Sequence, residues 1–577
     1  MRGNQSGARC AMLLGSAAAT MMAGNALASG RMHKPAAAQV LEARCARLAE
    51  AALRGAPVQG LAISAARWQR VQAGAASQPA HCLIEGHFGG HVGVIGGPYS
   101  IGFRMRLPAQ WNHRFLFQGG GGSNGVIGDA TGPNGPGNRS ALERGYAVIA
   151  QDSGHDNGRN AVADHGGVLA FGFDPQARRN YGHASLKPTN DLAHHLLRAF
   201  YGRDSVNSFF WGCSKGGQEG MAFVQRYPEA FDGIVAAAPG FALPRAALAE
   251  AWDTQAIASI LRARGEAPTL AGLKMALSAP SLALVRDVVL ATCDADDGAV
   301  DGMITAIGRC TAERVVPALR QRSCTAGASG HCLDEPIINA LARIMGGVRT
   351  AAGKNLYAPF PWDSGIAEPG WRVWKAGLEN GPPALNVLLG AGSLASVFTT
   401  APTPLPGDPE KMLAWQLSFD FERDAERINA IAAPFTTSAW QDVGMQDTDL
   451  SRFRARGGKL IVPHGMSDPV FSAYDTIQWW NAVDRRMGGQ AARFVRVFPV
   501  PGMNHCAGGP ATDRFDSLAA LERWVIENKA PDSIAATAGP ETPWPGRKRP
   551  LCPYPSVALP TGGSFSCGRL KAEGGRV

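Results

Sequence analysis

Residues 209–217 read Phe209-Phe210-Trp211-Gly212-Cys213-Ser214-Lys215-Gly216-Gly217. The run contains G-x-S-x-G, preceded by an apolar stretch typical of a strand and followed by a stretch compatible with a helix. Small residues beside the serine permit the tight strand-to-helix turn on which a hydroxyl stands exposed above a sheet. A glycine-rich turn with an ordinary serine is the alternative, but this context favours Ser214 as a nucleophile.

Strand and helix patterns alternate on both sides of this turn. Apolar runs that predict strands lie at 99–105, 115–117, 146–150, 209–211, 460–462 and 494–500. Helical patterns lie at 190–201, after the serine as far as Tyr227, and at 518–526. Strands that alternate with helices predict a mostly parallel sheet in an α/β domain.

The first 28 residues have the features of a secretory signal peptide. Arg2 and Arg9 give a positive start, residues 10–23 are mostly small or apolar, and Ala26-Leu27-Ala28 forms an A-x-A cleavage site. A buried N-terminal helix is the alternative. Cleavage would remove one of the 11 cysteines and leave an even number. An even number predicts disulfides in an exported protein, either periplasmic or extracellular.

The segment from about Phe241 to Gln441 differs from the rest of the chain in its sequence patterns. Strand patterns fade there, and proline and glycine interruptions are frequent. Four cysteines fall between Cys293 and Cys332, both included. We therefore expect a second domain, residues 241–441, inserted into an α/β domain that is made of residues 29–240 and 442–577.

Composition excludes several classes of protein. The 577 residues are 45% hydrophobic and 18% charged, which excludes general disorder. No apolar run reaches the ~20 residues that a membrane span needs, so we expect no membrane partner. The formal charge of +9 falls by two when Arg2 and Arg9 are removed. The remaining charge is modest for a chain of this size, and we expect no nucleic-acid partner.

A serine nucleophile needs a base, and the base needs an acid that orients it. In α/β hydrolases the acid and then the histidine follow the serine, on loops after late strands. Asp468 and His505 each follow a late predicted strand, in this order. His464 also follows a strand but precedes the acid, so we expect it to be structural. The predicted triad is Ser214, Asp468 and His505.

A glycine-rich loop at residues 118–125 follows the predicted strand at 115–117. It resembles the loops that supply oxyanion donors to ester hydrolases. A nucleotide-phosphate loop is the alternative, but no clear helix opens there and no fitting ribose acid follows. We expect the backbone N–H groups of Gly120 and Lys215 to form the oxyanion hole.

Taken together, Cys213-Ser214, Asp468 and His505-Cys506 resemble the tannase and feruloyl esterase family of serine esterases. The resemblance covers nearly the whole chain after residue 28, and the bacterial branch that cleaves the terephthalate monoester of ethylene glycol looks particularly close. It implies an α/β-hydrolase core with a large lid domain inserted between the nucleophile and the catalytic acid. It also implies five disulfides, namely Cys45–Cys82, Cys213–Cys506, Cys293–Cys310, Cys324–Cys332 and Cys552–Cys567.

An acidic loop lies between Cys293 and Cys310. Its carboxylates repel one another unless they are solvated or neutralised by a cation, and hard oxygen ligands favour calcium. An acidic surface turn is the alternative, and an EF-hand fits poorly because Ala299 stands where it needs glycine. The resemblance implies a structural calcium ion and no organic cofactor. The implied ligands are Asp294, Asp297, Ala299, Asp301 and Met303.

The resemblance also implies residues that contact the acyl group of the substrate. Leu243 and Trp374 match aromatic-acyl contacts of the terephthalate-monoester branch, although core packing is the commoner fate of a tryptophan in a helix. The arginine that holds the free carboxylate in that branch falls near Leu388, and no Arg or Lys occurs from Ala376 to Pro409. We therefore expect Leu388 to offer apolar contact to esters without a free carboxylate.

These features predict a secreted serine carboxylesterase that hydrolyses small esters of aromatic, phenolic acids. A terephthalate-monoester hydrolase is the alternative among enzymes. A non-catalytic secreted binding protein and a calcium-dependent adhesion module are the alternatives from other classes. Labelling of Ser214 by a fluorophosphonate would separate an enzyme from these.

Overall fold

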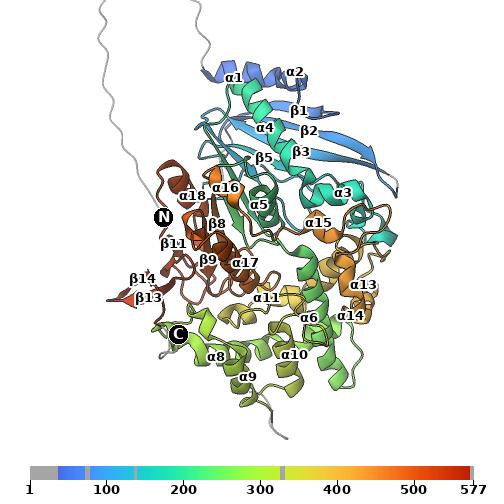
Figure 1. The fold of residues 1–577 in the computed structure, drawn as a ribbon, viewed down its shortest axis with the longest axis vertical. Helices are drawn as coiled ribbons and strands as arrows, with labels where there is room; N and C mark the ends of the chain where they lie inside the picture. Colours follow the sequence, from blue (N-terminus) through green and yellow to red (C-terminus); the bar gives the residue numbers. More distant parts are fainter. Residues whose placement is uncertain (1–36, 72–77, 96, 135–138, 325–331, 572–577) are drawn as a thin grey trace, which may run out of the picture.

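The apolar runs of the sequence form the strands of one large sheet (Figure 1). The computed structural model describes residues 37–71, 78–95, 97–134, 139–324 and 332–571. The signal peptide expected at residues 1–28 lies outside the described residues. The sheet has nine strands in the order β1-β2-β3-β5-β4-β6-β7-β8-β9. Their bounds are β1 (Ala62–Gln69), β2 (His81–Val92), β3 (Pro98–Pro108), β4 (Arg114–Gln118), β5 (Ala147–Gln151), β6 (Asn207–Cys213), β7 (Gly233–Ala237), β8 (Lys459–Gly465) and β9 (Val495–Val500).

The central sheet is mainly parallel. Neighbouring strands from β5 to β9 run parallel, whereas β1, β2 and β3 pair antiparallel and β3 pairs antiparallel with β5. The α/β class is therefore confirmed. β6 lies between β4 and β7, so its carboxyl end opens near the middle of the sheet, where α/β proteins place their sites.

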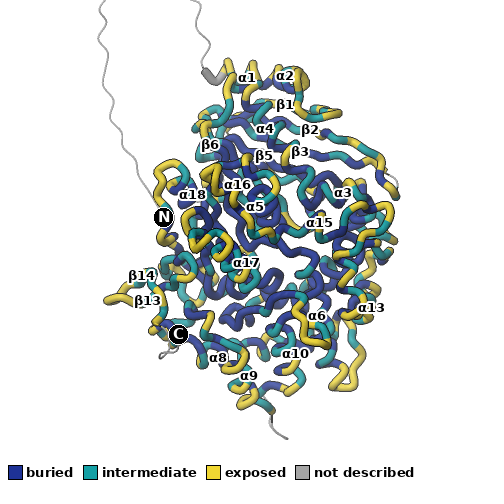
Figure 2. Tube along the Cα trace, viewed as in Figure 1, coloured by how far each residue is buried: buried dark blue, intermediate teal, exposed yellow. Residues whose placement is uncertain are grey.

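Helices cover both faces of the sheet because successive side chains of its buried strands point to opposite faces. Phe210 packs with Phe223 of α5 in one core, whereas its neighbour Phe209 belongs with Leu521 of α18 to the core of the other face. Figure 2 shows the tube of the sheet as largely buried. The helices that cover the sheet are α1 (Ala37–Ala46), α2 (Leu48–Leu53), α4 (Leu186–Tyr201), α5 (Lys215–Arg226), α17 (Ala473–Arg486) and α18 (Ser517–Ile526).

The named elements in the described residues of the long connection from β7 to β8 are all helices. Figure 1 shows α6 and α8 to α11 gathered at the lower end of the molecule, away from β1 to β3. The connection also contains a π-helix, η8 (Asn386–Ala391), which precedes α12. The α-helices are α6 (Leu243–Ala263), α7 (Leu270–Ala276), α8 (Ala279–Cys293), α9 (Ala312–Arg320), α10 (Glu335–Met345), α11 (Pro369–Lys375), α12 (Gly392–Ser396), α13 (Pro409–Ser418), α14 (Phe421–Asp424), α15 (Ala439–Val443) and α16 (Ser451–Ala455).

By length and composition alone, the segment Leu270–Asp297 could cross a membrane. In the fold, however, α7 ends at Ala276 and α8 begins at Ala279. Leu282, Val285 and Val289 of α8 are buried in the main core. Part of the apolar surface of the segment is therefore used in packing within the protein.

The remaining strands lie near the C-terminus. They form a three-stranded sheet and a hairpin, with β10 (Arg514–Phe515), β11 (Ile534–Thr537), β12 (Lys548–Leu551), β13 (Val557–Thr561) and β14 (Ser564–Gly568). All five disulfides implied by the resemblance are present, namely Cys45–Cys82, Cys213–Cys506, Cys293–Cys310, Cys324–Cys332 and Cys552–Cys567. Cys213–Cys506 spans 293 residues, whereas Cys45–Cys82, the next longest, spans 37. It alone ties together segments far apart in the sequence.

Candidate active site

The turn that carries Ser214 joins the end of β6 to the start of α5. Ser214 has φ 65° and ψ −122°, a strained conformation for a residue other than glycine. Its N–H donates to the carbonyl of Ala237 (3.1 Å), and its own carbonyl accepts from Gly240 N–H (3.2 Å). A Cβ at Gly212 would lie 2.5 Å from the carbonyl oxygen of Gly216. Glycine is therefore required at Gly212 for the helix to start so close to the strand.

The structure brings Ser214, Asp468 and His505 together from three loops. These loops follow β6, β8 and β9, whose carboxyl ends lie at the same edge of the sheet. His505 Nε2 lies 2.7 Å from Ser214 Oγ, and His505 Nδ1 lies 2.8 Å from Asp468 Oδ2. When Nδ1 donates to the carboxylate, Nε2 is left to accept the serine proton. The arrangement can therefore activate a serine hydroxyl.

Asp468 is buried and fully engaged by hydrogen bonds. Its Oδ1 accepts from the backbone N–H groups of Val470 (2.8 Å) and Phe471 (3.1 Å). Burial alone would raise the pKa of Asp468, but the charge of His505 and hydrogen bonds from His464 and His505 hold it well below its ordinary value. The carboxylate therefore stays ionised and can stabilise an imidazolium. His464, which donates one of these hydrogen bonds, has its Nδ1 2.9 Å from Thr476 Oγ1.

The disulfide Cys213–Cys506 joins the residue before Ser214 to the residue after His505, with the two Cα atoms 6.1 Å apart. It therefore links the serine turn directly to the histidine loop. Cys506 is exposed, whereas Cys293 and Cys310 are 1% exposed. A reductant in solution should reach the Cys213–Cys506 disulfide more readily than these buried cysteines.

The structure corrects one of the two expected oxyanion donors. The N–H of Gly120 donates to Glu219 Oε2 at 3.0 Å, so it is not free for a substrate oxygen. Lys215 is the first residue of α5, and no described residue accepts a hydrogen bond from its backbone N–H. Of the two expected donors, Lys215 keeps a free N–H and Gly120 does not.

The side chain of Lys215 points into a buried polar network. Its Nζ lies 3.0 Å from Glu219 Oε1 and 4.6 Å from the centre of the Tyr181 ring. Asn124 also donates to Glu219 Oε1, at 2.7 Å. Burial lowers the pKa of Lys215, while the charge of Glu219 opposes this effect. Glu219 thus binds both Lys215 and the glycine-rich loop, and the ammonium group is already paired.

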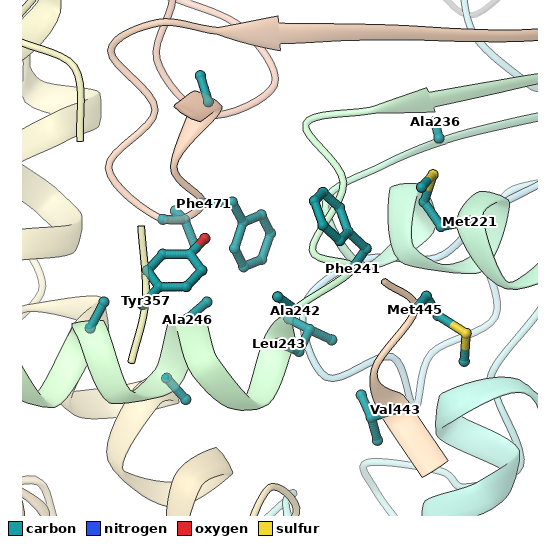
Figure 3. Close-up of a cluster of buried hydrophobic side chains, with 14 of the residues drawn as sticks. Met221, Ala236, Phe241, Ala242, Leu243, Ala246, Tyr357, Val443, Met445 and Phe471 are labelled. Carbon is teal, nitrogen blue, oxygen red and sulfur yellow. The ribbon is translucent and has the colours of Figure 1, made fainter. Parts of the chain in front are cut away.

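A pocket of about 50 Å³ opens beside Ser214. Leu243 and Trp374 line it, and the Trp374 ring lies 5.8 Å from the ring of His505. Leu389 lines the pocket as well, next to the expected contact Leu388, which stays a prediction. Figure 3 shows Leu243 and Ala246 on α6 below Phe471. The other lining residues are Gly122, Ser123, Tyr181, Lys215, Ala246, Ala247, Glu250, Ser393, Phe398, Val470 and Phe471.

A larger cavity of about 250 Å³ lies elsewhere, between the acidic loop and the C-terminal strands. Its lining includes Tyr474, Leu551 and Tyr554 and none of the three residues Ser214, Asp468 and His505. We therefore place the chemistry in the smaller pocket, because a reacting bond must lie within reach of the nucleophile and its base.

The acidic loop is held by protein groups. Asp301 pairs with Arg549, and Asp297 Oδ2 accepts from Thr305 Oγ1 (2.6 Å). Among the described residues, no group of three or more His, Cys, Asp or Glu side chains is arranged to hold a metal ion. Asp294 Oδ1, however, is buried without a hydrogen-bond partner. Burial, reinforced by the charges of Asp301 and Asp297, raises the pKa of Asp294.

Comparison with known proteins agrees with this architecture. The sequence profile described as "Tannase and feruloyl esterase" matches residues 91–569. The chain belongs to this family. It is 41% identical over 527 residues to mono(2-hydroxyethyl) terephthalate hydrolase of Piscinibacter sakaiensis, with 86% of each chain covered. It is 26% identical to a probable feruloyl esterase of Arthroderma benhamiae, over 83% of this chain and 84% of the relative.

Solved structures share the fold. The crystal structure of feruloyl esterase B from Aspergillus oryzae superposes with a TM-score of 0.70 at 21% identity, over 92% of this chain and 100% of that one. Tannin acyl hydrolase from Aspergillus niger gives a TM-score of 0.64 at 19% identity, over 91% and 95%. At these identities the likeness establishes the fold.

Sequence reasoning missed two buried glutamates at the site. Glu219 is four residues after Lys215 on α5, a spacing at which opposite charges pair, so this signal was available. Glu250 follows Leu243, Ala246 and Ala247 at helical spacing on α6 and lines the same pocket. A charged residue on an otherwise apolar helix face was the signal for Glu250.

Proposed function

We propose that this chain is a serine carboxylesterase that hydrolyses esters of aromatic, phenolic acids. The observation that carries the proposal is the position of His505, which contacts Ser214 Oγ through Nε2 and Asp468 through Nδ1. Membership in the tannase and feruloyl esterase family supports the choice of aromatic esters as substrates.

In this proposal Ser214 Oγ attacks the ester carbonyl while His505 takes the hydroxyl proton. His505 then gives this proton to the departing alcohol, and an acyl-enzyme remains on Ser214. Water, deprotonated by His505, releases the acid and restores the serine. Asp468 keeps Nδ1 as the donor and stabilises the imidazolium in both steps.

The backbone N–H of Lys215 is one proposed oxyanion donor. Because Glu219 binds Gly120 N–H, we assign the second donor to Gly121, the next amide of the same loop. The two residues that follow it, Gly122 and Ser123, line the pocket together with Ser214, which supports the assignment. Removal of one oxyanion donor typically costs a factor of about 10²–10³ in kcat.

Residues 241–441 act in this proposal as a lid domain between two parts of a hydrolase core, residues 29–240 and 442–577. The pocket is lined from both parts of the chain. The inserted segment contributes Leu243, Trp374 and Leu389, and the core contributes Ser214 and Phe471. The pocket of about 50 Å³ is smaller than the ~150 Å³ apolar cavity that accommodates benzene in another protein. In this proposal the lid side chains move when an aromatic acyl group enters.

The proposal also includes export of the protein and a structural calcium ion. Five disulfides support a periplasmic or extracellular location. The unpartnered Asp294 Oδ1 and the crowding of carboxylates around it support a structural calcium ion at the acidic loop. A calcium ion there would have to replace Arg549 as the partner of Asp301. The loop carries no step of the reaction.

The second candidate is hydrolysis of a terephthalate monoester, favoured by the 41% identity to mono(2-hydroxyethyl) terephthalate hydrolase. No arginine is among the residues that line the pocket, and the ammonium group of Lys215 is held by Glu219. A free carboxylate on the acyl group would therefore be buried without a cation, which is costly. For this reason we place neutral phenolic esters first.

Two measurements test the proposal. A fluorophosphonate probe should label wild-type protein at Ser214 and leave Ser214→Ala unlabelled, as shown by peptide mass spectrometry. A panel of feruloyl, galloyl and terephthaloyl esters should then give the highest kcat/KM for a phenolic ester. Absence of hydrolysis across the panel, with Ser214 unlabelled, would contradict the assignment as an enzyme.

A further inference from the structure

One face of α6 lines the pocket beside Ser214, which we call the acyl pocket. Leu243, Ala246, Ala247 and Glu250 follow the spacing i, i+3, i+4, i+7, and all four line the pocket. The start of the helix is held beside the nucleophile, because Gly240 N–H donates to the carbonyl of Ser214 at 3.2 Å. Seven residues correspond to a rise of about 10 Å along a helix. Glu250 therefore lies at the end of the pocket away from Ser214.

The carboxyl group of Glu250 is enclosed by three elements. The residue is 8% exposed, and no described residue donates a hydrogen bond to its carboxylate. A Cβ at Gly390, in η8, would lie 2.2 Å from Glu250 Oε2, so the carboxyl packs directly on this glycine. The third element is α11, whose Lys375 forms an ion pair with Asp253 of α6. Both partners of this ion pair are 1% exposed at their side chains.

Burial, together with the charges around it, determines the protonation of Glu250. Burial raises its pKa to about 8, an effect that the charge of Lys375 reduces and that of Asp253 increases. Tyr181 and Tyr357 also lie within the electrostatic reach of Glu250, and the pKa of each hydroxyl is raised mainly by burial. Burial outweighs the charge of Lys375, which is paired with Asp253, so the protonated form of the Glu250 carboxyl is favoured at neutral pH. It can then donate one hydrogen bond and accept another.

We propose that Glu250 selects the substrate by binding a phenolic hydroxyl at the far end of a 4-hydroxyaryl acyl group. The inference rests on the proposed function, since it names the acyl group that the same pocket takes. A phenol is also both a donor and an acceptor, so the two groups can form a reciprocal pair in a pocket that is otherwise largely apolar. A site built to bind a hydroxyl discriminates strongly against analogues that lack it, because its buried polar group is then left unpaired.

A terephthalate monoester would form less favourable polar contacts than a phenol at this end of the pocket. Its carboxylate could accept one hydrogen bond from protonated Glu250, but it would donate none and would meet no free cation. Lys375 is held by Asp253, and Lys215 is held by Glu219. The geometry therefore favours the phenol over the carboxylate.

The experiment compares kcat/KM for methyl 4-hydroxycinnamate and methyl cinnamate at about pH 6.5. The wild type should prefer the hydroxylated ester. Glu250→Leu should lower kcat/KM for that ester about tenfold while leaving methyl cinnamate within about twofold of the wild type. Glu250→Gln should keep the preference, because an amide also donates and accepts. Glu266→Leu, which removes an exposed glutamate beyond the end of α6, serves as the matched control and should change neither value.

Gly390→Ala provides an independent variant that keeps the glutamate. The added Cβ displaces the Glu250 carboxyl, so the preference for the hydroxylated ester should fall as in Glu250→Leu. If Glu250→Leu does not fold, this variant decides the question. Hydrolysis of both esters with a preference that neither Glu250→Leu nor Gly390→Ala alters would overturn the inference alone. Hydrolysis of neither ester by the wild type would overturn the proposed function as well.

Discussion

Replacement of both Cys213 and Cys506 by serine should lower stability and catalysis together. The disulfide closes a loop of 293 residues. For a loop of this length the chain-entropy relation gives roughly 5–6 kcal/mol, slightly above the range of about 0–5 kcal/mol that single disulfides contribute. The same bond holds the residues next to Ser214 and His505, and a displacement of about 1 Å between such groups can cost a factor of about 10² in rate. We therefore expect the double variant to lose about 10²-fold in kcat/KM.

Cys324→Ser with Cys332→Ser is the matched control. That disulfide closes a loop of only 8 residues, for which the same relation gives roughly 2.5 kcal/mol, and its cysteines belong to the helical connection from β7 to β8. The control should lose stability in urea at 25 °C and keep the kcat/KM of the wild type. If Cys213→Ser with Cys506→Ser keeps kcat/KM within about threefold of the wild type while folded, the disulfide does not position His505.

Three further predictions follow from buried carboxyls. Asp468→Asn should lower kcat about 10⁴-fold with little change in KM, because the amide favours the wrong tautomer of His505; a loss below tenfold in steady-state kinetics would contradict the role of Asp468. Glu250→Gln should stabilise the protein by up to about 3 kcal/mol at pH 7 and have no effect below about pH 4.5. The pKa of the Glu250 carboxyl is about 8 in the folded protein and about 4.5 in the unfolded chain. The wild type therefore loses stability as the pH rises between these two values, and the glutamine variant does not. Urea unfolding at both pH values measures this, and equal differences at the two would refute it. Chelation should lower the melting temperature and leave kcat unchanged, since binding to the native state alone stabilises it. An unchanged melting temperature would mean that Arg549 alone neutralises Asp301.

The residues of the proposed triad could be identified from sequence because the fold itself brings them together. Any parallel sheet in which β6, β8 and β9 lie near one another places the loops after them at one edge, and the sequence shows Ser214, Asp468 and His505 directly after these strands. The edge strand β1 and its neighbour β2 are not predicted by the sequence. Glycines and histidines interrupt the apolar alternation in β2, and pairing with β3 stabilises it instead.

The oxyanion loop and the far end of the pocket are harder to predict, for different physical reasons. A glycine-rich loop exposes backbone N–H groups and so suggests Gly120, but Glu219 reaches it from α5 and accepts that hydrogen bond. No local pattern in the loop reveals such a contact across the structure. The position near Leu388 stays a prediction, because it lies in a π-helix, in which one residue more than in an α-helix fits into a turn. Such a helix shifts the side chains that follow along its face, and Leu389 is the leucine of this segment that lines the pocket.

The sequence predicts the triad better than the acyl pocket because different contacts fix the positions of their residues. Hydrogen bonds of the sheet fix the ends of β6, β8 and β9 relative to one another, so the loops after them have few alternatives. The acyl pocket instead depends on how α6, α11 and η8 pack against one another, and a shift of one residue in η8 changes which leucine it presents. Gly390 and Glu250 face each other across that contact. Substrate preference should therefore change through substitutions in the helical connection, with the serine, acid and histidine unaltered.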